Sequence, residues 1–468
     1  MTASASTSAA AALRGARWYT AAFTAVGVLN YGYALLLTRL LDVADYTRFA
    51  AGQGLVLGAS AVATVMVPWV LAQTLARAGT GAEREDAIRF AGISSVIGGG
   101  LAAGVVAAVA SRFAGPAASS AVAASTLLIF LSTVAFGRLQ GTERQRAMSA
   151  LTIAEVCLKC AAGVLLVTVA RLGDVGALAA FGVGALPCLL WWPLPRRGSG
   201  ALWRNAVADR DLWRRALGVG GVQGMVALLG AIDPVMVTVL PDDRAAAASY
   251  QASVVLARVP VFLASAISMA FLPALSRRRS SRMLVRRAIG LYLVVALPVS
   301  AVFATAPGAV LAVAFPARYA MISVLLRYTA ISGFAIGGLS LLTTFFQAVD
   351  DFSCLWWQCV GLLGYAIALG AGWTLGGVPG LAAGAACGAL GALLLLACRL
   401  VRRSGWEVLG RIPLLELLVL IALLAATRPY PALWLVTAAL AGLRAAARFL
   451  RRSESLDDTP PRSGLPEG

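Results

Sequence analysis

The stretch from Phe352 to Cys398 reads FSCLWWQCVGLLGYAIALGAGWTLGGVPGLAAGAACGALGALLLLAC and contains no charged residue. Its length suffices for two membrane-spanning helices, because one span takes about 20 predominantly apolar residues. Gly376-Gly-Val-Pro-Gly380 interrupts the stretch near its middle, and glycine and proline mark such breaks. The stretch therefore predicts two consecutive transmembrane helices, over about 353–374 and 379–400.

The rest of the 468-residue chain has the same apolar character. Hydrophobic residues make up 60% of the chain and charged residues 13%, whereas soluble proteins contain roughly 45–50% and about 25%. A soluble fold cannot bury this much apolar surface, so we expect an all-α polytopic membrane protein with about 14 transmembrane helices. The other predicted spans cover about 18–38, 49–76, 90–111, 114–136, 148–170, 175–194, 215–240, 246–274, 287–306, 321–347, 412–427 and 430–450.

The basic residues indicate how these spans are oriented. The chain has 39 Lys and Arg against 21 Asp and Glu, a net charge of +18. If the N-terminus is cytoplasmic, 29 of the basic residues fall in cytoplasmic segments, 7 in outside loops and three within spans. The positive-inside rule therefore predicts that both termini are cytoplasmic. The basic excess is explained by loops that set topology and face anionic lipid head groups, and we expect no nucleic-acid partner.

Several kinds of chemistry are excluded by the residues that the chain lacks. It has no histidine, which removes the Ser-His triad, histidine metal ligands and imidazole proton relays. The only lysine, Lys159, lies outside any P-loop motif. The seven cysteines lie within or at the ends of apolar runs, which argues against a disulfide framework. We expect no catalytic residue, no cofactor and no metal site, and hence no enzyme.

Three short motifs recur after about 200 residues and indicate an internal repeat. The pairs are 38–42 with 238–242 (T-x-L-x-D in both), 75–77 with 275–277, and 140–143 with 347–350. They place span 7 on span 1 and span 8 on span 2. Spans 1 and 7 both run from inside to outside, so the repeats are parallel and related by a pseudo-two-fold axis along the membrane normal.

The repeat predicts two six-helix lobes followed by a C-terminal helix pair. The predicted segments are a disordered N-terminus 1–13, an N-lobe 14–194 (spans 1–6), a cytoplasmic linker 195–214, a C-lobe 215–403 (spans 7–12), spans 13 and 14 within 404–452, and a disordered tail 453–468.

Three stretches carry a resemblance to a known family. Residues 35–60, LLLTRLLDVADYTRFAAGQGLVLGAS, resemble the first outside turn of polysaccharide-exporting flippases, with the acidic-Tyr pair Asp45-Tyr46. Residues 231–277 resemble spans 7 and 8 of the same family, in which an aspartate, a tyrosine and a proline recur, here Asp233, Tyr250 and Pro273. GRLQGTERQRAMSALTIAE, residues 137–155, is similar to the loop between spans 4 and 5. Thr47 departs from the pattern, because a glycine is common at that position of the family.

The resemblance covers roughly residues 18–400 and points to the multidrug/oligosaccharidyl-lipid/polysaccharide exporter (MOP) superfamily, with Wzx-type polysaccharide flippases the most similar branch. It implies a flippase in a bacterial plasma membrane that moves an undecaprenyl-diphosphate-linked oligosaccharide by alternating access during polysaccharide biosynthesis. It also implies that spans 1, 2, 7 and 8 line the cavity. The expected partners are the lipid-linked oligosaccharide, membrane lipid, other polysaccharide-assembly proteins and a coupling cation, either a proton or sodium.

Two other functions stay open. A cation-coupled antiporter for drug-like small molecules would share the fold, and organic-cation export favours acidic residues in the cavity. A membrane polysaccharide polymerase or ligase would need a long outside loop with arginines or carboxylates, and no outside loop here exceeds about 15 residues.

Arg258 and Asp233 are the first candidates for a substrate site, because an intramembrane charge needs a partner or a hydrated cavity. Arg258 lies near the middle of span 8, and Asp233 precedes Pro234, which lacks an N–H and loosens span 7. In one interpretation Arg258 binds a diphosphate while Asp233 holds Arg258 or a coupling cation. In the other, the two residues form a buried ion pair that fixes the geometry of the lobe.

Other polar residues within spans have weaker signals. Arg327 lies near the outer boundary of span 10, where it can snorkel to the surface. Four amides could bind sugar hydroxyls, although interhelical hydrogen bonding is their more frequent use; they are Asn30, Gln53, Gln223 and Gln251.

Glu155 and Lys159 are four residues apart on span 5 and therefore share one helical face. The first interpretation is a local ion pair that lowers the cost of inserting both charges, and the alternative is proton coupling through Glu155. The arginines of 277–287 are explained as positive-inside residues, with recruitment of anionic substrate as the alternative.

Overall fold

The structure is a computed structural model that describes residues 25–77, 80–142, 144–191, 210–240, 243–277, 282–349, 351–409 and 414–457. Within these ranges the secondary structure is entirely helical, as predicted. A helix over 25–40 precedes α2. The longer helices are α2 (Val43–Arg77), α3 (Gly81–Ala110), α4 (Pro116–Gly141), α5 (Gln145–Thr168), α6 (Gly173–Leu190), α8 (Arg210–Leu229), α10 (Arg244–Ala257), α11 (Val259–Arg277), α12 (Arg282–Thr305), α14 (Ile322–Ala348), α15 (Cys354–Ser404), α16 (Leu414–Thr427) and α17 (Pro431–Asp457), and the shorter ones are α9 (Ile232–Val239), α13 (Gly308–Ala314), η1 (Ala317–Tyr319) and η2 (Trp406–Leu409).

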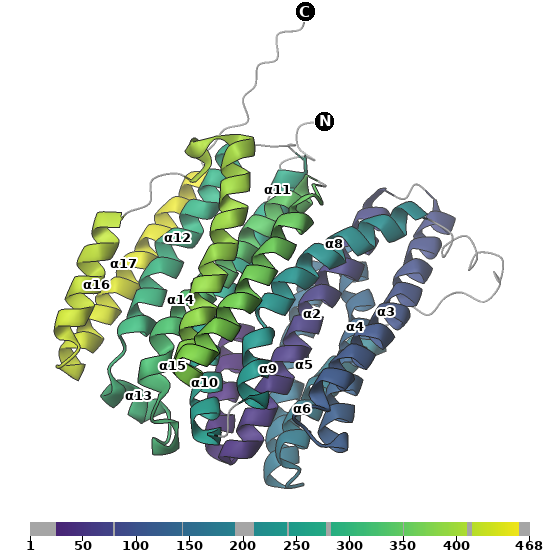
Figure 1. Cartoon of the computed structure of the whole chain (residues 1–468). Coiled ribbons are helices and arrows are strands. Elements are labelled where there is room, and N and C mark those ends of the chain that lie inside the picture. Colours follow the sequence, from purple (N-terminus) through teal and green to yellow (C-terminus); the bar gives the residue numbers. More distant parts are fainter. Residues whose placement is uncertain are drawn as a thin grey trace, which may run out of the picture.

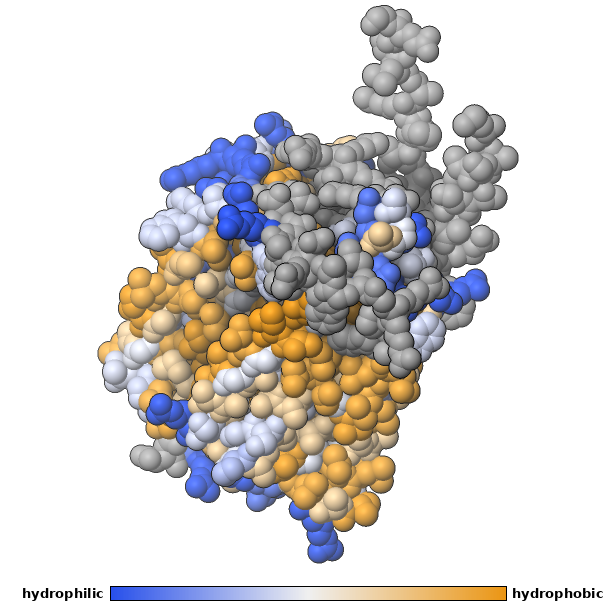
Figure 2. All heavy atoms as spheres, turned by 90° about the vertical axis from the view of Figure 1, so that its right-hand side faces the viewer, coloured by the Kyte–Doolittle hydropathy of each residue, from blue (hydrophilic) through white to orange (hydrophobic). Residues whose placement is uncertain are grey.

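The described helices have the length and composition of membrane spans. Ten helical segments of the described residues could each cross a membrane, one of which, Arg244–Ser268, joins α10 to the first part of α11. An eleventh span arises if α8 and α9, bent by 41°, are taken as one. Figure 2 shows that hydrophobic residues cover the middle of the molecule, while hydrophilic residues gather toward its two ends. This is the surface expected of a multi-pass membrane protein, because lipid tails replace water around the belt.

The number of candidate membrane spans rises further because α15 contains both spans predicted from the charge-free stretch. Gly376 and Gly377 have non-helical backbone angles, and Gly377 has a φ of 58°, a left-handed conformation that favours glycine. The two halves fold back on each other: a Cβ added at Gly384 would lie 2.2 Å from the Ala368 carbonyl oxygen, and one at Gly361 would lie 3.0 Å from Ala392. The 51-residue helix is therefore an antiparallel hairpin of two spans.

The outer ends of the predicted segments need correction. Most predicted spans are shorter than the helices that contain them; α3, for example, begins at Gly81 rather than near 90, because helices extend past the bilayer into water. The helix α17 continues to Asp457, into the tail predicted to be disordered, and α8 begins at Arg210, inside the predicted linker. The predictions for 1–13, for most of the linker and for the tail after 457 fall outside the described residues.

Two spans of the second half are broken at proline. Pro234 is the third residue of α9, directly after the bend from α8. Arg258 is the C-cap of α10, directly after Ala257, and Pro260 is the second residue of α11. Proline cannot donate a helical hydrogen bond, so both breaks follow from the sequence. They place Asp233 and Arg258 at helix ends within their spans.

The first and second halves repeat the same packing pattern. In the first half, α4 packs against α2, α3 and α6, and α5 packs against α6. In the second half, α14 takes the place of α4 and packs against α10, α11, α12 and α15. The second span of each half ends at matching positions, Arg77 and Arg277, the offset of 200 residues that the motifs predict. The same packing pattern in both halves supports the predicted repeat, while the six-helix division and its boundaries stay predictions.

The lobes lie side by side in Figure 1, the N-lobe in purple and blue and most of the C-lobe in green. They meet where α2 packs against α8, α9 and α10. The pair α16 and α17 packs against α12, at the edge of the C-lobe. Trp434 of α17 donates a hydrogen bond to Thr305 at the end of α12, at 3.3 Å.

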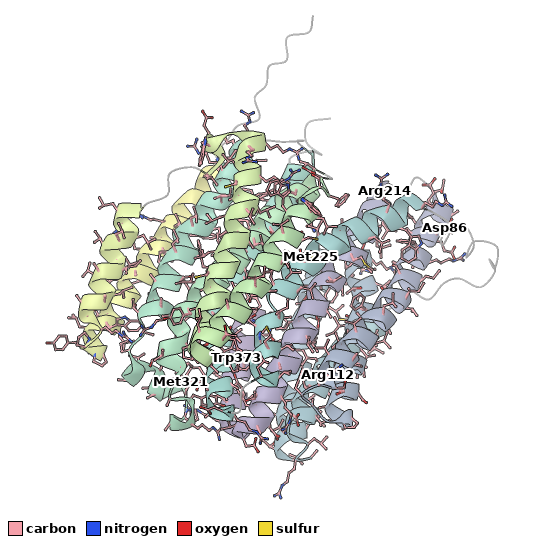
Figure 3. The ribbon with its side chains drawn as sticks, in the orientation of Figure 1. Asp86, Arg112, Arg214, Met225, Met321 and Trp373 are labelled. Carbon is pink, nitrogen blue, oxygen red and sulfur yellow. The ribbon has the colours of Figure 1, made fainter. Side chains whose placement is uncertain are left out.

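The bundle has two ends, which we name after labelled residues in Figure 3. Asp86 and Arg214 lie at one end, the Asp86 end, and Arg112 lies toward the other, the Arg112 end. The helix α3 runs from the first to the second, and successive spans alternate in direction. The arginine distribution predicts that the Asp86 end is cytoplasmic, and this orientation stays a prediction.

Candidate functional site

Asp233 is the charged centre of the C-lobe. It is the second residue of α9 and its side chain is only 4% exposed. Tyr250 of α10 donates a hydrogen bond to Asp233 Oδ2, at 2.6 Å between the oxygens. The phenol of Tyr365 on α15 lies against the same carboxylate, although its hydroxyl and Asp233 Oδ1 are both buried without a standard hydrogen bond. Tyr250 thus holds this carboxylate by a hydrogen bond while Tyr365 packs beside it, and no ion pair with Arg258 forms.

Gln251 stabilises the broken span next to Asp233. Its amide donates to the Pro234 carbonyl at 2.6 Å and to Thr238 Oγ1 at 3.0 Å. The side chain is 2% exposed. Gln251 therefore joins α10 to α9 by interhelical hydrogen bonds, which is the more frequent use expected for it.

Arg258, unlike Asp233, has a side chain that is only partly buried and has no hydrogen-bond partner among the described residues. Its side chain is half-buried and points toward the N-lobe, where a Cβ added at Gly54 of α2 would lie 3.6 Å from Arg258 Nη2. The ionisable groups near it are Asp233 and Tyr46. Within the described part of the chain, its guanidinium forms neither a hydrogen bond nor an ion pair. Arg258 is therefore an intramembrane cation at the interface between the lobes that makes no direct ion pair with a described residue, although Asp233 lies within electrostatic range.

Lys159 is the charged centre of the N-lobe. Its side chain is 7% exposed, and its ammonium group donates to Asn30 Oδ1. It also lies over the rings of Tyr33 and Phe181, at 5.5 and 4.8 Å from their centroids. An amide oxygen and two aromatic faces thus surround this cation, an arrangement that stabilises a buried ammonium group.

Glu155 stays on the same face of α5 but forms no ion pair with Lys159. Its Oε2 accepts a long contact from Cys188 Sγ, at 3.9 Å. The local ion pair suggested by the four-residue spacing is wrong, because the lysine turns to Asn30 instead. Proton coupling through Glu155 stays a prediction.

The remaining candidate residues are not brought into one cluster by any contact. Gln53 of α2 is buried, and Gln223 of α8 and Arg327 of α14 are half-buried. None of the three side chains has a hydrogen bond or an ion pair with another described residue. Their predicted roles in substrate binding stay predictions. The described residues also contain no group of three or more Cys, Asp or Glu that could hold a metal ion.

Hydrogen bonds between the lobes gather at the Arg112 end. Arg318, beside α13, donates to the carbonyls of Thr38 and Leu41, the latter at 2.8 Å. Arg39 donates in the other direction to the Val313 carbonyl at 3.0 Å. All three acceptors are backbone carbonyls, so these bonds hold the two lobes together without charge neutralisation.

One aromatic contact links this end to the neighbourhood of Arg258. Tyr46 of α2 packs edge-on against Tyr319, with ring centroids 5.5 Å apart, and Tyr46 is also an electrostatic neighbour of Arg258. The sequence indicated Tyr46 only as part of a family motif. Tyr319 and Tyr365 carried no signal at all, since a lone tyrosine in an apolar run has many uses.

Comparison with solved structures identifies the fold. A multidrug resistance MATE family transporter of the MOP superfamily, solved in an inward-facing conformation, superposes with a TM-score of 0.60 at 14% identity and covers 85% of this chain and 100% of its own. The lipid II flippase MurJ, in an inward closed conformation, superposes with a TM-score of 0.67 at 11% identity, over 93% and 99%. The eukaryotic MATE transporter AtDTX14 gives 0.57 at 15% identity, over 86% and 99%.

The fold is that of the MOP superfamily. The likeness extends over nearly the whole of each MOP structure, so both lobes are included. No family model and no curated protein matches the sequence. The superpositions show a shared fold. Because the sequence identities are only 11–15%, membership of the Wzx-type branch stays a prediction.

Proposed function

We propose that this chain is a flippase that moves an undecaprenyl-diphosphate-linked oligosaccharide across a bacterial plasma membrane for polysaccharide biosynthesis. It acts by alternating access and catalyses no covalent step. Both termini lie in the cytoplasm. The fold supports transport, because it is shared with the MurJ flippase and with MATE transporters.

The observation that carries the proposal is the unpaired guanidinium of Arg258. The carboxylate of Asp233 is buried and held by Tyr250, whereas Arg258 is half-buried and faces the other lobe. The charge presented to a substrate between the lobes is therefore positive. A planar guanidinium suits the oxygens of a diphosphate, and an organic cation would be repelled.

The other residues have supporting roles in this proposal. The side-chain amides of Gln53 and Gln223 form no hydrogen bond with another described residue. They are therefore suited to form hydrogen bonds with sugar hydroxyls. Asp233 binds or releases the coupling cation, and its buried Oδ1, which accepts no hydrogen bond from a described residue, is the atom that takes the proton. The lobes rock about the central site. One net charge that crosses the membrane exchanges about 2.3 kcal/mol per 100 mV, enough to drive the cycle in one direction.

A cation-coupled antiporter for small molecules is the second candidate, because MATE transporters share the fold. Asp233 is the residue on which that function would depend. Its enclosure by Tyr250 and Tyr365 makes it less accessible to an organic cation than Arg258 is to an anion.

The test compares two ligands that share a tail. Purified protein is titrated in detergent with undecaprenyl diphosphate and with undecaprenol, which lacks the diphosphate. We expect Arg258→Ala to weaken binding of the diphosphate at least tenfold, since a charge-assisted bond contributes about 1.5–3 kcal/mol, and to leave undecaprenol binding unchanged. Arg258→Lys should recover part of the loss, because an ammonium group replaces the bidentate fork.

The control is Arg402→Ala, which removes an exposed arginine from the last turn of α15. It should bind both ligands like the wild type. In a strain that lacks the native gene, Arg258→Ala should abolish surface glycan while the protein stays in the membrane. Equal binding of undecaprenyl diphosphate by Arg258→Ala and by the wild type would refute the assignment of Arg258. Saturable binding of ethidium by a wild-type protein that does not bind undecaprenyl diphosphate would favour the antiporter function.

A further inference from the structure

Three polar side chains between the lobes lie near one another and have no hydrogen-bond partner. They are Tyr31 of the helix over 25–40, Tyr46 of α2, and Arg258, the C-cap of α10. Tyr46 is an electrostatic neighbour of both Tyr31 and Arg258. None of the three side chains forms a hydrogen bond or an ion pair with another described residue. We call these three residues the interlobe site.

The two phenols of the interlobe site are buried. Tyr46 is 1% exposed, and the hydroxyl oxygen of Tyr31 is buried without a partner. Burial of a hydroxyl that forms no hydrogen bond costs free energy, and the great majority of such groups in proteins therefore have a partner. Two phenols without one do not serve the stability of the fold, and a bound ligand would supply the missing acceptors.

The first turn of α2 holds the ring of Tyr46 in place. Arg48 Nε donates to Asp174 of α6 at 2.9 Å, which ties this turn to the N-lobe. The Tyr46 ring packs against Phe49 and against Tyr319 of the C-lobe, with ring centroids 6.2 and 5.5 Å away. These contacts use the aromatic ring of Tyr46 and leave its hydroxyl available.

Arg258 approaches the same face of α2 from the C-lobe. Tyr46 and Gly54 are eight positions apart, so they share one face of that helix. A Cβ added at Gly54 would lie 3.6 Å from Arg258 Nη2. No hydrogen bond joins the Tyr46 hydroxyl to the guanidinium. An anion that contacts both groups must therefore bridge a gap that no single hydrogen bond spans, with oxygen atoms at both of its ends.

A diphosphate has these properties, and a monophosphate does not. The planar guanidinium of Arg258 fits two oxygens of one phosphate group, and a phenolic O–H can donate to an oxygen of the second. Phenols are uncharged donors, so they add hydrogen bonds without adding another buried charge. A monophosphate bound to Arg258 has no second phosphate group to reach the phenols.

We propose that Tyr46 determines specificity for a diphosphate over a monophosphate. Its hydroxyl, together with that of Tyr31, binds the phosphate group that Arg258 does not reach. This inference rests on the proposed function and adds the N-lobe half of the binding site to it. The acidic-Tyr motif thereby gains a role in ligand recognition, and the bound diphosphate links the two lobes.

The test compares undecaprenyl diphosphate with undecaprenyl phosphate, titrated against the full chain in detergent. The wild type should bind the diphosphate more tightly. Tyr46→Phe keeps the ring and its packing and removes only the hydroxyl. It should weaken diphosphate binding about tenfold, since a hydrogen bond to a charged group is lost, and leave monophosphate binding unchanged. Tyr31→Phe should show the same selective loss.

Thermal unfolding without ligand separates a binding role from a structural one. Removal of a buried hydroxyl that lacks a partner takes away a desolvation cost, so Tyr46→Phe should unfold at the wild-type temperature or above it. Tyr33→Phe is the matched control, because Tyr33 is 3% exposed and its hydroxyl donates to the Ala177 carbonyl at 3.5 Å. It should bind both lipids like the wild type.

Two results would overturn the inference and leave the proposed function standing. The first is diphosphate binding by Tyr46→Phe that equals the wild type, while Arg258→Ala binds the diphosphate less tightly. The second is an equal loss of both lipids in Tyr46→Phe together with a lower unfolding temperature, which would show that the hydroxyl is structural. A wild type that binds neither lipid would instead refute the proposed function, and this inference with it.

Discussion

The charged centres of the two lobes are opposite in arrangement. In the N-lobe the buried charge is the cation, Lys159, which Asn30 and two aromatic rings surround. In the C-lobe the buried charge is the carboxylate of Asp233, which Tyr250 holds, while the cation Arg258 faces the other lobe. The same packing of helices thus surrounds opposite charges in its two copies.

The difference separates structural charges from charges available to a substrate. Lys159 has its contacts within the N-lobe, and its removal should first affect stability. Arg258 has no partner among the described residues, so its removal should change binding and leave the fold intact. The following variants test this division, in order of decreasing effect.

Tyr250→Phe should have the largest effect on stability. It removes the hydrogen bond to Asp233 Oδ2 and leaves a carboxylate that is 4% exposed with one partner fewer. A buried charged group that loses its partner costs about 2–3 kcal/mol. Thermal unfolding in detergent should show this loss. Asp233→Asn/Tyr250→Phe should lose less than Tyr250→Phe alone, because no charge is left unpaired; an equal loss would mean that Asp233 is already uncharged.

Lys159→Met should destabilise the N-lobe by a smaller amount. The change keeps the volume but leaves Asn30 Oδ1 without its donor and removes two cation–π contacts. Relief of the buried charge offsets part of this, so we expect a loss of about 1–2 kcal/mol. The matched change in the C-lobe, Arg258→Met, should alter stability by less than about 0.5 kcal/mol. Greater destabilisation by Arg258→Met than by Lys159→Met would show that Arg258, rather than Lys159, is the structural charge.

Arg318→Ala should weaken the contact between the lobes at the Arg112 end. It removes the hydrogen bonds to the carbonyls of Thr38 and Leu41, which contribute about 0.5–1.5 kcal/mol each. The population with this end open should therefore rise by about tenfold. Arg39→Ala removes a single exposed bond and should have a smaller effect of the same sign.

The measurement uses spin labels at the exposed positions 112 and 244. Arg112 lies toward this end in Figure 3, and Arg244 begins α10, which packs against η1, the short helix that contains Arg318. The exposed cysteines Cys157, Cys387 and Cys398 are first replaced by serine. The distance distribution of Arg318→Ala should gain a longer component that the parent lacks. Identical distributions would show that the interhelical packing of α2 alone keeps the lobes together.

Asp351→Asn should have the smallest effect, about 0.5–1 kcal/mol at neutral pH, because Arg399 and Arg403, with which Asp351 pairs, are partly exposed to solvent. Partial burial raises the pKa of Asp351, but the hydrogen bonds from Ser353 and the two arginine charges outweigh it and hold the pKa below its usual range in the folded protein. The carboxylate therefore stabilises the fold above its unfolded-state pKa of about 4. This contribution is lost as the pH falls through the lower folded-state pKa. The stability difference between wild type and Asp351→Asn should therefore shrink between about pH 4 and pH 2; a difference that is constant with pH would contradict it.

Much of the architecture could be read from residue patterns. The charge-free stretch 352–398 predicted two helices, and Gly377 forms the turn between them. The recurrence of 75–77 at 275–277 predicted parallel lobes, and α2 and α11 end at the corresponding arginines. These features depend on local properties: apolar length sets a span, glycine permits a turn, and proline breaks a helix.

The charged sites could be predicted only in part. An intramembrane charge is costly wherever it lies, so the sequence alone identified Asp233, Arg258, Glu155 and Lys159 as residues in need of an explanation. The partners of these residues were decided by the tertiary structure. Lys159 turns to Asn30, 129 positions away, rather than to Glu155 in the next turn, and Tyr365 reaches Asp233 from another span. A hydrogen bond between distant helices depends on how the helices pack, and no pattern along one helix records that packing.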